Sequence, residues 1–229
     1  MPLSSAVLAA LLGGQVLPAS EAIVSPPDSG QLEIIKTQPD PDHRMTVAVR
    51  IGNQGSYRFV IDTGSQSTVL STSLAQRLAL QPARKVRVVG VGGTDTVETA
   101  IVADLGIGRR SYNDLEVALL EGHDIGAEGI VGIDSLQRQR VLLDFARNTI
   151  AVGDAKLLGG NSGFDIVVTA RRRLGQLIMT NANIDGVRTN VIIDTGAETS
   201  VGNRAMQQAL SHRATGMQTT LITATGQEI

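Results

Sequence analysis

Two short segments of the same kind occur in this chain, and each joins an apolar run to a turn that carries an acid. They are Phe59–Ser65, with the sequence Phe-Val-Ile-Asp-Thr-Gly-Ser, and Val191–Ala197, with the sequence Val-Ile-Ile-Asp-Thr-Gly-Ala. The apolar runs predict buried strands that end at the acid. A carboxylate in that place has an apolar floor, so it needs hydrogen bonds or a partner charge. Two such acids, from two related halves, are what a site of paired carboxylates requires.

The composition is typical of a folded, β-rich protein. The chain has 229 residues, enough for one large or two small domains, and 42% of them are hydrophobic against 18% charged. The 25 Gly, together with many Val, Ile and Thr, favour strands and turns over long helices. A net charge of −2 gives no reason to expect a nucleic-acid partner. Because the sequence has no Cys, it forms neither disulfides nor thiolate zinc sites.

The two acid-bearing turns carry a resemblance to a known family. Asp62-Thr63-Gly64-Ser65 and Asp194-Thr195-Gly196-Ala197, each after apolar residues, resemble the signature of aspartic proteases. The short repeat is similar to the retroviral, or retropepsin-like, branch. This resemblance implies catalytic roles for Asp62 and Asp194, with the other six residues forming the active-site loops.

Two further segments agree with that resemblance. Glu128–Leu136 is similar to the strand and short helix that close a retropepsin lobe, and Val141–Phe145 resembles the last strand of bacterial members. The likeness covers 45–152 well and 175 to the end only in part. It implies an all-β fold: a retropepsin-like acid protease β-barrel lobe, duplicated, with the second copy truncated.

The sequence divides into four parts on this interpretation. Residues 1–30 are a signal-like segment and linker, because an apolar run is followed by small residues typical of a cleavage site. The alternative for this segment is a loosely packed apolar arm, since no basic residue precedes the run. Residues 31–155 form the first aspartic protease lobe and 156–174 a linker. Residues 175–229 form the partial second lobe.

Several elements of the first lobe follow from local patterns. An alternating strand at 45–51 and a return strand at 57–61 are joined by a hairpin turn and deliver Asp62. A helix at 73–78 is expected to begin with a Ser73 cap. Two strands flank Gly92 and Gly93, and their position resembles the flap that folds over substrate in the family; the alternative is an ordinary surface hairpin. Gly129 and Gly132 are expected to permit close packing beneath the active-site loop, while Asp134 is expected to be a cap or surface acid.

The second half repeats this order. A strand at 177–184, a turn at Asp185-Gly186 and a helix at 203–210 surround the second acid. Residues 219–229 are expected to form the first flap strand and tip, with Gly226 corresponding to Gly92. Nothing corresponds to 94–152, so either the second lobe is truncated or a partner completes it. The basic cluster 171–173 is expected to be a solvated face.

Paired carboxylates suggest a mechanism. Two carboxyls close together share a proton, so one acts as general base on a water while the other donates to the scissile carbonyl oxygen. The sequence therefore predicts an aspartic endopeptidase, with Asp62 acting with Asp194 in cis or with Asp62 of a second chain. The alternatives are plain turns at the two acids, or an inactive peptide-binding or scaffolding module of the same fold.

The remaining expectations concern partners and location. We expect a polypeptide substrate, no cofactor, no metal and no nucleic acid, with a homodimer as one arrangement. His43, His123 and His212 lack metal-ligand spacing and are expected on the surface. The signal-like segment predicts export to the periplasm or outside the cell, with membrane contact only through that segment if it is not cleaved.

Overall fold

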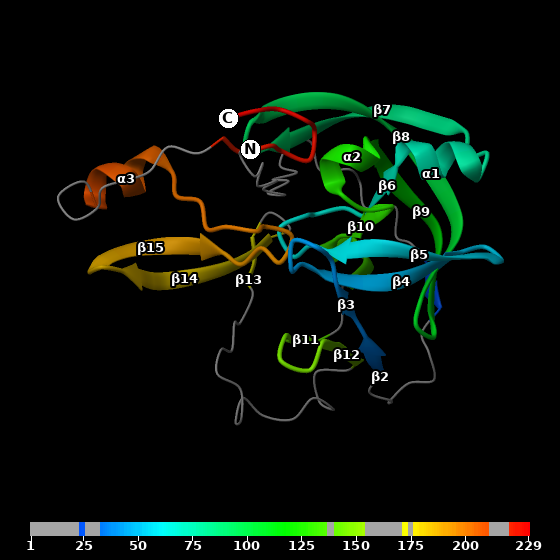
Figure 1. Cartoon of the computed structure of the whole chain (residues 1–229), viewed down its shortest axis with the longest axis horizontal. Coiled ribbons are helices and arrows are strands. Elements are labelled where there is room, and N and C mark those ends of the chain that lie inside the picture. Colours follow the sequence, from blue (N-terminus) through cyan, green and yellow to red (C-terminus); the bar gives the residue numbers. More distant parts are fainter. Residues whose placement is uncertain (1–22, 26–32, 137–139, 154–170, 174–175, 211–219) are drawn as a thin grey trace.

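The computed structural model describes residues 23–25, 33–136, 140–153, 171–173, 176–210 and 220–229. These residues are mostly strands, with a few short helices (Figure 1). In chain order the elements are β1 (Ile23–Ser25), β2 (Glu33–Lys36), β3 (Gln38–Pro39), β4 (Met45–Ile51), β5 (Gln54–Ile61), β6 (Val69–Ser71), α1 (Thr72–Arg77), β7 (Pro82–Gly90), β8 (Gly93–Ile107), β9 (Arg110–Leu120), α2 (Gly122–Ile125), β10 (Gly129–Val131), the 3-10 helix η1 (Ile133–Leu136), β11 (Arg140–Asp144), β12 (Thr149–Gly153), β13 (Arg171–Arg173), β14 (Gln176–Ile184), β15 (Val187–Ile192) and α3 (Arg204–Leu210).

Six strands of the first lobe close into a barrel. The hydrogen-bonded order is β9-β6-β10-β5-β4-β8, and β8 also pairs with β9, which completes the ring. The alternation predicted for β4 is confirmed, because Val47 and Val49 are buried while Ala48 and Arg50 are exposed. The predicted all-β barrel of the first lobe is therefore confirmed.

The barrel interior is filled mainly by aliphatic side chains. Among the described residues, Phe59 is the one phenylalanine of this core, and it lies fully buried together with Ile61 and Leu70. Val60, between two of these residues on β5, belongs to a separate apolar cluster. Successive side chains of a strand point to opposite faces, so β5 has apolar contacts on both faces. This double burial fixes the position of the residue that follows the strand, Asp62.

β10 holds the end of β5 in place. The two strands are parallel, with Ile130 opposite Val60 and Val131 opposite Ile61. The backbone N–H of Asp62 then donates to the Val131 carbonyl at 3.1 Å. β6 pairs with the other edge of β10 and also with β9, so the acid-bearing turn extends from a row of four neighbouring strands, β5-β10-β6-β9.

Two smaller sheets complete the described part of the chain. β11, β12 and β2 form one of them, and β13, β14 and β15 form the other. β14 and β15 make the hairpin predicted around Asp185-Gly186, and in Figure 1 it extends away from the barrel strands. α3 lies within the predicted helix at 203–210. The four domain boundaries, and the duplication itself, stay predictions.

Three local expectations are wrong. Ser71, not Ser73, caps α1, because its side chain accepts a hydrogen bond from the Leu74 N–H. Residues 23–25, expected outside the fold, pair with β9 as strand β1. Arg171–Arg173, expected within the linker, form β13 and pair with β14. The rest of the signal-like segment and most of the linker lie outside the described residues. In the part of the chain that the structure describes, no helix is long and apolar enough to cross a membrane.

The glycines of the β10 region are needed for close packing, as predicted. A Cβ at Gly129 would overlap the Phe59 ring, and one at Gly132 would overlap the backbone of Ser67 and Thr68.

We therefore expect Gly132→Ala to lower the free energy of unfolding by about 1–3 kcal/mol, because backbone cannot move aside as a side chain can. Gly202→Ala is the matched control, since its Cβ would make only ordinary contacts with Met206. Urea unfolding followed by circular dichroism measures both, and equal effects would contradict the packing argument.

Candidate active site

The two acid-bearing turns, which are far apart in the sequence, meet in the structure. Asp62 directly follows β5, and Asp194 comes two residues after β15. Threonine hydroxyls join the turns reciprocally. Thr63 Oγ1 donates to the Ile193 carbonyl at 2.7 Å, and Thr195 Oγ1 donates to the Ile61 carbonyl at 2.6 Å.

The backbone adds a second pair of bonds to this junction. The Thr195 N–H donates to Thr63 Oγ1 at 3.1 Å, and the Thr63 N–H donates to Thr195 Oγ1 at 3.2 Å. Each hydroxyl therefore donates to one strand end and accepts from the opposite turn. The arrangement is nearly symmetric, so it fixes both turns relative to each other.

Each carboxylate lies against the glycine of the other turn. A Cβ at Gly64 would come within 2.6 Å of the Asp194 carboxyl carbon, and one at Gly196 within 2.6 Å of the Asp62 carboxyl carbon. Real Cβ atoms do not tolerate such distances. Glycine is therefore required at both positions so that the two acids can approach each other.

Backbone amides orient the two carboxylates. Asp62 Oδ1 accepts from the Gly64 N–H at 2.7 Å and from the Ser65 N–H at 2.9 Å. Asp194 Oδ1 accepts from the Gly196 N–H at 2.8 Å. The other oxygen of Asp62, Oδ2, is buried and has no donor among the described residues. That oxygen faces the second turn.

Burial and mutual repulsion change the acidity of this pair. Burial raises the pKa of Asp62 well above its usual value, and the neighbouring Asp194 charge raises it further. Burial also raises the pKa of Asp194, while the neighbouring Asp62 carboxyl and the backbone N–H groups of Gly196 and Ala197 oppose that rise. Asp62 is fully buried and Asp194 only partly so. The more complete burial of Asp62 favours its neutral form.

The residues after the two glycines differ between the turns. The Ser65 hydroxyl donates to the Ser67 carbonyl at 2.8 Å, so it braces its own loop. Ala197 has no hydroxyl to do the same. The two turns are thus not equivalent.

Asp134 is a correction to the sequence-based expectation of a cap or surface acid. Its carboxylate accepts from the Thr68 N–H at 2.8 Å, from Thr68 Oγ1 at 2.7 Å and from the Ser135 N–H at 2.7 Å. Burial raises the pKa of Asp134. It therefore ties η1 to the loop that follows the first acid. In the sequence, only the Gly132-Ile133-Asp134 order could have pointed to a structural role for Asp134. That order does not indicate which residue the carboxylate contacts.

A charged cluster that the sequence did not reveal lies beside the second turn. Arg44 and Asp40 form a buried ion pair, with 2.7 Å between Arg44 Nη2 and Asp40 Oδ2. Glu198, which follows Ala197, is close enough for both charges to affect it, and burial raises the pKa of Glu198. The charges of Asp40 and Arg44, in the first lobe, therefore act on Glu198, in the second half of the chain.

The three predicted flap glycines also come together. Gly92 and Gly93 lie at the turn between β7 and β8, and Gln227, next to Gly226, contacts both positions. The β7–β8 hairpin is confirmed as a hairpin. Its role as a flap stays a prediction.

Other candidate sites are weaker. Among the described residues, no group of three or more His, Asp or Glu is placed to hold a metal ion. His43 and His123 are exposed, as predicted, and His212 lies outside the described residues.

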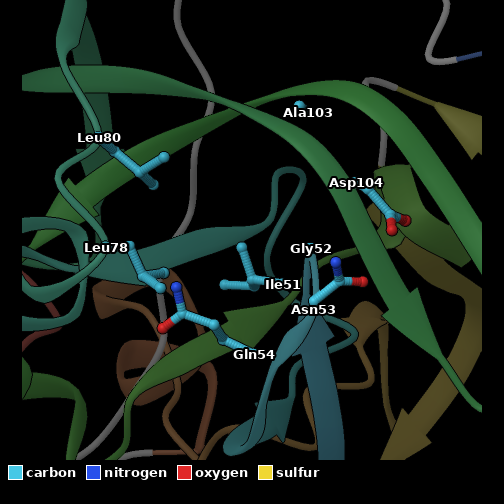
Figure 2. A pocket seen from close by; sticks show the side chains of 8 residues that line it. All are labelled: Ile51, Gly52, Asn53, Gln54, Leu78, Leu80, Ala103 and Asp104. Carbon is cyan, nitrogen blue, oxygen red and sulfur yellow. The ribbon is translucent and has the colours of Figure 1, made fainter.

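An apolar cavity of about 380 Å³ is lined by Ile51, Gly52, Asn53, Gln54, Leu78, Leu80, Ala103 and Asp104, which are shown in Figure 2. It adjoins the opposite end of β5 from Asp62, so it is separate from the acid pair.

Comparisons with known proteins bear on the first lobe. A family model described as aspartyl protease matches residues 47–135, which include Asp62, the β7–β8 hairpin and β10. Residues 47–135 are therefore similar to the aspartyl protease family. Among solved structures, the chain is similar to a crystal structure of a retropepsin-like aspartic protease from Rickettsia conorii. The match has 18% sequence identity and a TM-score of 0.40, and it covers 53% of this chain and 89% of that one. No curated protein matches the chain.

The threonine junction gives a prediction about the stability of the two joined turns. Thr63→Val removes a hydroxyl that donates to Ile193 and accepts from Thr195, so we expect a loss of about 1–3 kcal/mol in the free energy of unfolding. Thr63→Ser keeps the hydroxyl and is the matched control. Thr195→Val, with Thr195→Ser as its control, and the double valine variant complete a double-mutant cycle, in which urea unfolding measures the stability of each protein. Additive valine effects would contradict a shared junction, because contacting partners should couple.

The acidity of Asp62 gives a second prediction. A raised pKa means that the folded protein holds a proton that the unfolded chain releases, so stability is lost as pH rises toward that pKa. Asp62→Asn does not titrate, so its melting temperature relative to the wild type should increase from pH 4 to pH 8. Each tenfold change in proton affinity corresponds to about 1.4 kcal/mol, or roughly 3–6 °C.

A surface acid provides the control of opposite sign. Arg147 lowers the pKa of Asp144, so that carboxylate stabilises the fold above its unfolded pKa and the effect is lost at lower pH. Asp144→Asn should therefore lose melting temperature relative to the wild type only as pH rises through the acid range up to the unfolded value of 3.8, and the difference should stay nearly constant from pH 4 to pH 8. Parallel profiles for Asp62→Asn and the wild type would show that Asp62 is not a high-pKa acid.

Proposed function

We propose that the chain is an aspartic endopeptidase whose site pairs Asp62 with Asp194 within one chain. The observation that carries this proposal is the placement of the two carboxyls, each against the glycine of the other turn and joined through reciprocal threonine bonds. The family match of the first lobe supports the same chemistry. The substrate class is a polypeptide.

The unequal surroundings of the two acids suggest their roles. Asp62, the more deeply buried acid, holds the shared proton on the oxygen that faces the second turn. Asp194 is then the carboxylate and acts as general base on a water between the two acids.

The reaction follows from those protonation states. The water oxygen bonds to the scissile carbonyl carbon while one water proton moves to Asp194, and the Asp62 proton moves to the carbonyl oxygen. The resulting gem-diol breaks its carbon–nitrogen bond, and the leaving nitrogen takes the proton from Asp194. One diol hydroxyl returns its proton to Asp62 as the new carboxyl group forms. Both acids regain their starting states, and no covalent intermediate with the protein is required.

Two further points belong to this proposal. A homodimer that pairs Asp62 with its own copy is the alternative arrangement, and an inactive binding module is the alternative function. Export to the periplasm or outside the cell is proposed from the signal-like segment of the sequence alone.

Cleavage of casein, an unstructured protein, from pH 3 to pH 8 tests the proposal. Asp62→Asn and Asp194→Asn keep size and remove charge, and each should lower kcat/KM by at least about 10³-fold, because each acid carries a proton-transfer step. Activity of the wild type should fall as pH rises through the raised pKa of Asp62, where the shared proton is lost.

The outcomes separate the alternatives. Loss of activity in both variants supports pairing in cis, whereas loss in Asp62→Asn alone supports a homodimer of first lobes. Asp144→Asn is the control, because that acid pairs with Arg147 on the surface. A wild type that binds casein but cleaves none at any pH would replace the endopeptidase by the binding module.

A further inference from the structure

Residues 221–229 form a small hairpin of their own. Leu221 and Ile229 exchange backbone hydrogen bonds of 2.9 Å in both directions, and the Thr223 N–H donates to the Gln227 carbonyl at 2.9 Å. The turn closes between Thr223 and Gly226, again at 2.9 Å. We call this segment the 221–229 hairpin.

The tip of this hairpin is attached to the tip of the β7–β8 hairpin. Gln227 Nε2 donates to Asp95 Oδ2 at 2.6 Å. A Cβ at Gly92 would lie 2.7 Å from Gln227 Oε1 and 2.9 Å from Thr223 Cγ2. On its other side the hairpin contacts α2, because a Cβ at Gly226 would lie 2.7 Å from Asp124 Oδ2. Figure 1 shows the same segment, in red, between β7 and α2.

The hairpin also places one apolar side chain on the barrel. Ala224 is 2% exposed, and it packs within the apolar cluster formed by Val60, Val69, Ala118, Leu120, Ile125 and Ile130. This cluster lies on the face of β5 opposite the barrel core, since Phe59 and Ile61 fill the core and Val60 lies between them. Val60 is two residues before Asp62 on the same strand. The covered surface therefore leads directly to the acid pair.

The attachment is small enough to be reversible. Among the described contacts, the hairpin contributes two small buried side chains, those of Thr223 and Ala224, and one side-chain hydrogen bond to the β7–β8 hairpin, from Gln227 to Asp95. A polypeptide with a larger apolar side chain would bury more area on the same surface, and burial is worth roughly 25 cal/mol per Å². A substrate can therefore outcompete the hairpin.

We propose that the 221–229 hairpin is an intramolecular strap that covers the apolar surface beside Asp62, and that the Gln227–Asp95 hydrogen bond is its clasp. The strap holds the site closed until a polypeptide displaces it. This inference rests on the proposed function, because it takes the surface beside the acid pair as the place where a polypeptide binds. Its test uses binding and amide exchange, which do not require cleavage.

Three variants in an Asp62→Asn background test the clasp. Gln227→Glu places a carboxylate against Asp95 and opens the strap at pH 7, where free carboxylates are ionised. Asp95→Asn keeps an acceptor for Gln227 and is the matched control. The double variant Asp95→Asn with Gln227→Glu restores a bond, since the asparagine amide donates to the glutamate.

Labelled casein and hydrogen–deuterium exchange supply the two measurements. In Gln227→Glu the hydrogen bond between residue 227 and Asp95 is lost, so a larger fraction of the protein has an open strap. Because the closed strap competes with casein, casein binding should tighten about tenfold in this variant. The amides of Thr223 and Ile229 should exchange faster in that variant. Both quantities should return to the background level in the double variant.

Other results would overturn the strap. Unchanged exchange at Thr223 and Ile229 in Gln227→Glu would show that Gln227 and Asp95 form no clasp. Faster exchange with unchanged or weaker casein binding would show that the hairpin does not compete with a polypeptide. Failure of the proposed function appears separately, as absence of cleavage by the chain with Asp62 intact.

Discussion

The site depends on the reciprocal hydrogen bonds of Thr63 and Thr195. Two carboxyls that face each other inside a protein are costly, because each loses hydration and each repels the other when ionised. Four bonds between the two turns hold them in place despite that cost. They do so without adding charge, since threonine donates to one carbonyl and accepts from one amide. The same bonds bring Gly64 and Gly196 beneath the opposite carboxyls, which no larger residue would allow.

The barrel supports this junction on one side. Asp62 bonds to the end of β10, and the following loop is held to η1 by Thr68 and Asp134. Each of these contacts satisfies a buried polar group that would otherwise be destabilising. The second turn has fewer such supports among the described residues: the β14–β15 hairpin delivers Asp194, and Glu198 lies beside the buried pair of Asp40 and Arg44. The first turn is thus the rigid partner, to which the second is joined.

The sequence predicted what local patterns encode. An alternating run predicted β4, two apolar runs predicted the strands before each acid, and Asp185-Gly186 predicted a hairpin turn, because each depends on residues within a few positions of one another. The cap of α1 was assigned to Ser73 instead of Ser71 because both serines precede an apolar helical residue, and only the backbone geometry distinguishes them.

Contacts between distant residues were beyond the same reasoning. Asp134 reaches Thr68 across 66 positions, and Gln227 reaches Asp95 across 132. Neither acid carries a local signal that separates it from a surface acid, since its role comes from the side chain that the fold brings to it. The pairing of Asp62 with Asp194 was foreseen only because both acids occur in the same motif. β1 and β13 were missed for the related reason that short edge strands are defined by their partners and not by their own pattern.

The two halves of the site differ in a way that bears on its chemistry. Identical acids in identical surroundings would share a proton equally, and neither would have a fixed role. Here Asp62 Oδ1 accepts backbone hydrogen bonds of 2.7 and 2.9 Å, yet burial and the neighbouring Asp194 charge still raise the pKa of Asp62. Its second oxygen has no donor among the described residues. A proton on that oxygen removes the unsatisfied acceptor and supplies a donor toward Asp194. Asp194 is less buried, so its charge is less costly. In the proposed mechanism, this unequal burial would assign the donor role to Asp62 and the base role to Asp194.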